Sequence, residues 1–145
     1  MTTAHRAIRQ AMVDRLKAAP ALVGGRVFAN RDRSIGVDSP NAIVVRLRRS
    51  VCQLASVIGG PTNWTTLVSV ECYGRAASDD SPADQVVDDV FAKLAVDPTL
   101  GGLVMECVPY EGDTLNWDSE ELDEKLECIT AIFEIKHQTT GRTLT

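Results

Sequence analysis

Residues 65–97 read TTLVSVECYGRAASDDSPADQVVDDVFAKLAVD and place a strand pattern directly before a helix pattern. From 64 to 73, apolar residues alternate with polar ones, which is typical of a strand with one buried face. Ser81 then has the character of a helix N-cap, Pro82 suits the first helical position, and apolar residues recur every three or four positions. The stretch predicts a sheet that carries a helix on one face.

The segments on either side extend this pattern. An amphipathic helix is predicted over about 4–19, and Asp97-Pro98 ends the second helix. The other predicted strands are 27–28, 41–49, 103–110 and 126–136. Long strands joined by short turns favour antiparallel pairing, and two helices with single apolar stripes should cover the same sheet face. We expect an α+β fold with a single domain over 1–145: a mainly antiparallel or mixed sheet of about four or five strands, two helices on one face, and a flexible tail from about 138.

Length and composition limit the class of protein. The chain has 145 residues, of which 44% are hydrophobic and 24% charged, as in an ordinary globular domain. It contains no apolar run near the ~20 residues of a membrane span, and its first residues do not have the pattern of a signal peptide. The sequence therefore predicts a soluble, intracellular protein that does not contact a membrane.

Catalytic and metal-binding patterns are absent from the sequence. The two histidines, His5 and His137, lie near the ends of the chain, and there is no phosphate-binding loop, GxSxG or HExxH motif. The four cysteines lack metal-ligand spacing and suit reduced thiols in apolar segments. The sequence predicts a protein that is not an enzyme and that binds no cofactor or metal.

Charge is divided unevenly along the chain. Residues 1–49 carry ten Lys and Arg against three Asp and Glu, a balance of +7, whereas 50–145 carry five against seventeen, a balance of −12. The basic residues Arg46, Arg48 and Arg49 and an acidic group form a candidate interface between copies of the chain; the acidic group is Asp118, Glu120, Glu121, Asp123 and Glu124. Complementary but separate patches give head-to-tail contacts, which close into rings. The alternative is that folding mixes these charges and leaves an ordinary surface.

Two segments are candidate docking elements. The acidic segment 111–124 is either a solvated hairpin or a docking element anchored by Trp117, since its spacing does not match a calcium-binding loop. The loop 50–63 with the neighbouring Trp64 is either an ordinary hairpin connection or a docking element; its apolar candidates are Val57 and Ile58. Nucleic-acid recognition is disfavoured because the chain is acidic and lacks a basic platform with interleaved aromatic residues.

The element order and size resemble the tail terminator, or tail completion, proteins of long-tailed bacteriophages. The segments that carry this resemblance are LVGGRVFAN at 22–30, SPNAIVVRLRR at 39–49, TTLVSVECYG at 65–74, SPADQVVDDVFAKLAVD at 81–97 and LECITAIFEIKHQ at 126–138. The amphipathic N-terminal helix precedes them, so the resemblance in element order runs along nearly the whole chain. The resemblance lies in the order of the elements rather than in a single diagnostic motif.

This resemblance implies an α+β structural protein without catalytic residues. Such proteins form a ring, typically a hexamer, on the head-proximal end of the tail tube. The ring stops tube growth and offers a surface to the head-completion or connector protein, and genome DNA passes through it without sequence-specific binding. The implied partners are further copies of the chain, the tail tube protein and the connector, and the implied location is the virion tail, with assembly in the host cytoplasm. The alternatives are another head–tail joining or tail-tube-related subunit, or a small cytoplasmic ligand-binding domain or enzyme.

Overall fold

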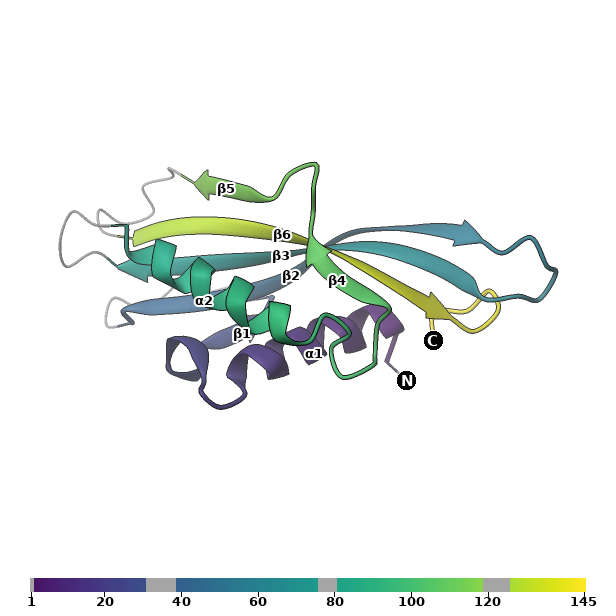
Figure 1. Ribbon diagram of the computed structural model, residues 1–145, viewed down its shortest axis with the longest axis horizontal. Helices are drawn as coiled ribbons and strands as arrows, with labels where there is room; N and C mark the ends of the chain where they lie inside the picture. The colour runs from purple at the N-terminus through teal and green to yellow at the C-terminus, as the bar shows by residue number, and fades with distance from the viewer. Residues whose placement is uncertain (1, 31–38, 76–80, 119–125) are drawn as a thin grey trace.

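A twisted six-stranded sheet forms the framework of the molecule (Figure 1). The computed structural model describes residues 2–30, 39–75, 81–118 and 126–145. The strands are β1 (Val27–Ala29), β2 (Asn41–Leu54), β3 (Thr62–Arg75), β4 (Glu106–Pro109), β5 (Leu115–Asp118) and β6 (Leu126–Thr139). Their order is β1-β2-β3-β6-β4, with β5 also paired to β6, and only the β1–β2 pair is parallel. The α+β class and the mixed sheet are confirmed, with six strands instead of four or five.

The three long strands extend further than their apolar patterns predict. β2, β3 and β6 have 14 residues each. Polar residues continue β6 as far as Thr139, because Gln138 and Thr139 pair with Asn63 and Thr62 of β3. The tail expected from about 138 therefore begins later than predicted, since the polar character of these two residues concealed a paired strand.

Two helices, α1 (Ala4–Lys17) and α2 (Pro82–Val96), match the predicted segments closely. Thr3 caps α1, because its Oγ1 accepts a hydrogen bond from the backbone N–H of Arg6 at 3.2 Å. Ser81 occupies the N-cap position of α2, but its hydroxyl donates to Glu127 instead of accepting from the helix.

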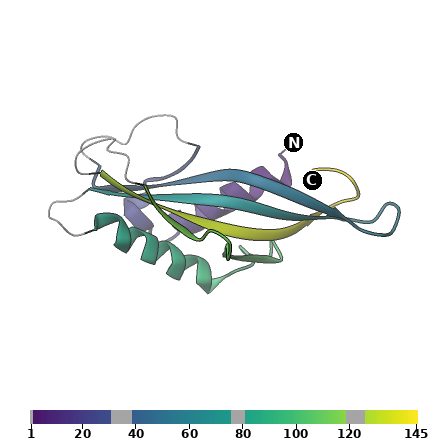
Figure 2. The same cartoon turned by 90° about the horizontal axis from the view of Figure 1, so that it is seen from above.

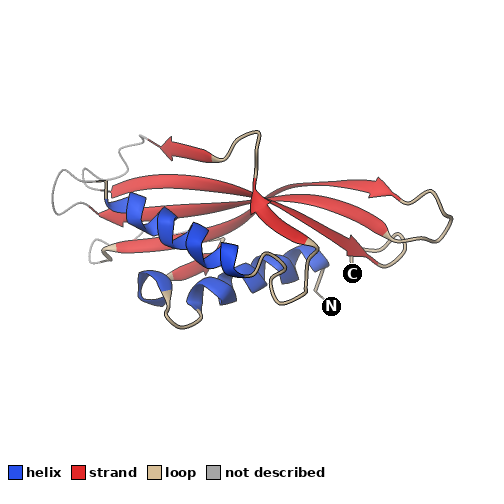
Figure 3. Ribbon diagram, viewed as in Figure 1, coloured by secondary structure: helices blue, strands red, loops and turns tan. Residues whose placement is uncertain are grey.

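Both helices cover the same face of the sheet, and one hydrophobic core lies between the two layers (Figures 2 and 3). The largest side chains in this core are Phe133, Ile8, Met12, Leu16, Ile43, Leu94, Ile129 and Ile135. The start of α2 lies so close to β3 that a Cβ atom at Gly74 would be 2.5 Å from the carbonyl carbon of Pro82. Glycine at this position therefore permits the close approach of helix and strand.

The β2–β3 hairpin extends well beyond the two helices (Figure 1). We call the part formed by residues 50–66 the hairpin arm. A β-bulge between Leu47 and Arg49 precedes the arm in β2. Because a bulge inserts one extra residue, it shifts the alternation of side chains between the two faces of the sheet.

Candidate functional site

The predicted basic patch is divided by the bulge in β2. Arg46 lies opposite Ser69, and Arg49 lies opposite Leu67, so these two arginines share the sheet face without helices. Arg48 is the extra residue of the bulge. Strict alternation predicts Arg46 and Arg48 on one face and does not predict Arg49 there, whereas the bulge brings Arg49 onto the face of Arg46.

Arg46 is engaged within its own chain. Its Nε lies 3.2 Å from Glu71 Oε1, and the Tyr73 hydroxyl donates to the other carboxylate oxygen at 2.9 Å. Burial is the main cause that raises the pKa of Tyr73 far above its usual range. Arg46 is therefore part of an internal polar network, whereas Arg48 and Arg49 are exposed.

The tip of the hairpin arm carries the most exposed apolar side chains of the predicted docking loop. Val57 is 68% exposed and Ile58 is 98% exposed, and Val51 and Leu54 are also exposed along the arm. A turn closes the tip, with the Gly60 N–H donating to the Val57 carbonyl oxygen at 3.0 Å. This surface fits the docking prediction for Val57 and Ile58 in its position and exposure.

Trp64 belongs to the interior of the arm. Its indole N–H donates to Thr139 Oγ1 at 2.9 Å, and its ring meets the His5 ring edge-on with centroids 4.8 Å apart. The side chain is half-buried. These contacts let Trp64 join β3, β6 and α1, and its docking role stays a prediction.

The predicted acidic patch is described only in part. Trp117 lies in β5 opposite Ile129 and is 63% exposed, so it remains a candidate anchor. Asp118 ends β5 opposite Cys128. Glu120, Glu121, Asp123 and Glu124 lie outside the described residues.

A chain of hydrogen bonds that the sequence did not predict connects both histidines. His5 Nε2 lies 2.9 Å from Ser50 Oγ, which is 2.8 Å from Thr66 Oγ1, which in turn is 2.7 Å from His137 Nε2. The two imidazole rings meet edge-on with centroids 4.9 Å apart. We call these four residues the histidine cluster.

The histidine cluster is adapted to uncharged imidazoles. His137 is only 2% exposed, and its Nδ1 is buried without a hydrogen-bond partner. Burial, with a further contribution from His5, lowers the pKa of His137 to about 4, and burial also lowers the pKa of His5. Both rings are therefore neutral at pH 7, and the cluster joins the first turn of α1 to the arm.

The pair of Ser50 and His5 contains two of the three parts of a hydrolytic triad. Within the described part of the chain, His5 has hydrogen-bond contact with Ser50 but none with a carboxylate that could orient the ring. The geometry supports a structural connection better than catalysis.

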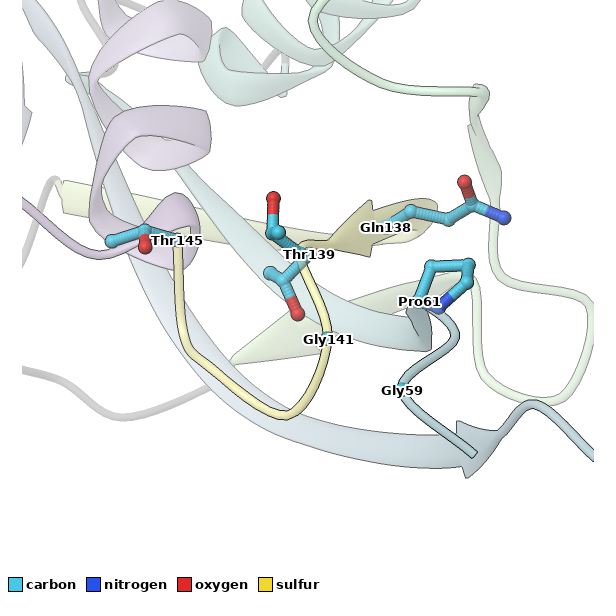
Figure 4. Close-up of a pocket in the computed structure, with 7 residues that line it drawn as sticks. Gly59, Pro61, Gln138, Thr139, Gly141 and Thr145 are labelled. Atoms are coloured by element: carbon cyan, nitrogen blue, oxygen red, sulfur yellow. The ribbon is translucent and has the colours of Figure 1, made fainter. Parts of the chain in front are cut away.

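A shallow groove of about 450 Å³ lies where the arm meets the end of the chain (Figure 4). Its lining comes from the arm turn and from the segment after β6: Gly59, Pro61, Gln138, Thr139, Thr140, Gly141 and Thr145. The side chains of these residues therefore offer hydrogen-bonding groups and no ionisable group.

The described residues offer neither a metal site nor a membrane-spanning helix. These residues contain no group of three or more His, Cys, Asp or Glu side chains that could hold a metal ion. Neither described α-helix has the length and apolar character needed to cross a bilayer. None of the four cysteines forms a disulfide with another, and of the four only Cys52 is exposed.

No protein-family model matches the chain, and no curated protein matches its sequence.

Proposed function

We propose that this chain is a structural subunit of a phage tail that caps the head-proximal end of the tail tube as a ring. The ring stops tube polymerisation and offers a surface to the head connector. The resemblance in element order supports this role. The single observation that carries it is the hairpin arm, whose apolar tip at Val57 and Ile58 lies in solvent far from the helices.

An exposed apolar tip on a paired two-stranded arm suits a contact made after folding. Burying apolar surface contributes about 25 cal/mol per Å² removed from water, so two such side chains on each subunit provide a useful contact. In a ring of identical subunits these contacts act together, and weak individual contacts give strong attachment to a tube end.

The overall charge of the chain is compatible with a channel for DNA. Its net charge is −5. Attraction to phosphates requires Lys and Arg that release counterions, and an acidic subunit would not hold passing DNA tightly. In this role the subunit has partners but no substrate.

The arm tip is the part of the proposal that can be tested by mutation. Val57→Asp combined with Ile58→Asp is expected to weaken binding to purified tail tubes by about tenfold or more, because two charges would enter an apolar contact in every subunit. Co-sedimentation of the purified chain with tubes of the parent phage measures this binding.

Val96→Asp is the matched control. Val96 is 75% exposed at the end of α2, away from the arm, and its substitution should leave tube binding unchanged. Unchanged binding by the arm variant would contradict the docking role of the tip, and a wild-type chain that never binds tubes would contradict the proposed function.

A further inference from the structure

The outer side of β2 is a long, incompletely paired strand edge. β2 has 14 residues, but β1 pairs only with Ile43–Val45. From Ser50 to Leu54, the part of β2 on the hairpin arm, β3 is the only strand partner among the described residues. An edge of this kind presents free backbone N–H and C=O groups to another strand.

The direction of the backbone groups can be derived from the β1–β2 pairing. The Ile43 N–H donates to the Arg26 carbonyl oxygen, and the Val45 carbonyl oxygen accepts from the Asn30 N–H. Ile43 and Val45, whose side chains lie in the core, therefore direct their backbone groups to the outer side of β2.

On the arm, after the bulge, the residues on the helix-covered face again direct their backbone groups to the outer side of β2. Ser50 lies opposite Thr66 and Cys52 lies opposite Trp64, and both are on the helix-covered face of the sheet. They are therefore equivalent in orientation to Ile43 and Val45 before the bulge. Strand alternation then directs the backbone groups of Ser50, Cys52 and Leu54 outwards and those of the residues between them towards β3. These three alternate residues thus offer N–H and C=O groups to a partner strand.

The two edges of the sheet carry opposite charge. Residues 41–54 of β2 contain three arginines and no acidic residue. Residues 103–118, which contain β4 and β5 on the opposite edge, include Glu106, Glu111, Asp113 and Asp118 and no Lys or Arg. Glu106 forms an ion pair with Lys136 of β6 at 3.6 Å, so the acidic excess of this edge comes from the other three residues. A single chain cannot bring its own two edges together, but a second copy can supply the missing one.

We propose that the β2 edge over Ser50–Leu54 pairs, backbone to backbone, with the β4–β5 edge of a second copy, so that the sheet continues from one subunit to the next. The contact is head-to-tail and uses a different edge on each side, which is the arrangement that closes into a ring. The bulge and the exposed Arg48 and Arg49 limit indiscriminate pairing and favour an acidic partner edge. This inference rests on the self-assembly required by the proposed function and names the surface responsible.

The substitution Cys52→Pro tests the backbone pairing. Cys52→Pro removes one outward N–H, which an edge strand tolerates without loss of its inner ladder. Self-association, measured by sedimentation equilibrium at low salt, should weaken by about tenfold or more, while circular dichroism shows a folded chain. Cys52→Ala removes the thiol but keeps the N–H, and its association should equal that of the wild type.

A charge exchange tests the identity of the partner edge. Arg48→Glu with Arg49→Glu is expected to weaken association by about tenfold, and so is Glu111→Arg with Asp113→Arg. Combining all four substitutions in one chain should restore association, because opposite charges then face each other again. Both effects should diminish at high salt.

Each outcome decides between the alternatives. Loss of association with both Cys52 variants, or with neither, overturns the backbone pairing. Loss with Cys52→Pro but no rescue by charge exchange overturns the β4–β5 edge as the partner. A wild-type chain that stays monomeric at millimolar concentration overturns the inference, whereas tube capping by the same chain would leave the proposed function standing.

Discussion

Replacing Phe133 with alanine is expected to lower the free energy of unfolding by about 3–5 kcal/mol. Phe133 is 2% exposed in β6, and its ring packs against that of Phe91 from α2 with centroids 5.1 Å apart. The truncation removes apolar contacts and leaves a cavity where the sheet and α2 meet. Urea denaturation followed by circular dichroism measures the change.

Phe28→Ala is the matched control, since Phe28 is only half-buried and lies in the short strand β1. Its effect should be clearly smaller than that of Phe133→Ala. Equal losses for the two variants would contradict the placement of the core between β6 and α2.

Acidification is expected to destabilise the fold through the histidine cluster. The pKa of His137 is about 4 in the folded chain and 6.5 in its unperturbed state, so below pH 6.5 the unfolded chain binds a proton that the folded chain does not. Stability therefore falls as the pH decreases from 6.5 towards 4. Between pH 7 and pH 5, His137 should account for a loss of about 2 kcal/mol.

The variant His137→Leu isolates this contribution from that of the carboxylates. Its free energy of unfolding should change less between pH 7 and pH 5 than that of the wild type, by about the same 2 kcal/mol. Chemical denaturation at several pH values gives the comparison. Identical pH profiles for the two chains would show that the imidazole of His137 titrates normally in the folded state.

Local sequence signals predicted the helices and the central strands well. The bounds of α2 follow from Ser81, Pro82 and Asp97-Pro98, which are start and stop signals within a few residues of the helix ends. The ends of β2, β3 and β6 were missed because polar residues such as Thr62 and Thr139 occupy positions on the core face there. Pairing with a neighbouring strand, which no local pattern records, keeps these residues in the sheet.

The candidate surfaces were predicted only in part, because contacts between distant parts of the chain leave no local pattern in the sequence. The exposure of Val57 and Ile58 follows from a Gly-Gly-Pro turn, which is a local signal. The alternation of residue types does not indicate the bulge at Arg48, so the sequence does not predict which sheet face carries Arg49. The histidine cluster joins residues 5, 50, 66 and 137, which only the folded chain brings together.

Negative-stain electron microscopy of purified tail tubes, with and without the wild-type chain, gives the decisive test of the ring-forming role. We expect a closed ring at one end of each tube and no further growth when tube protein is added. A chain that polymerises into long filaments, that binds along the tube wall, or that is absent from both tube ends would contradict it.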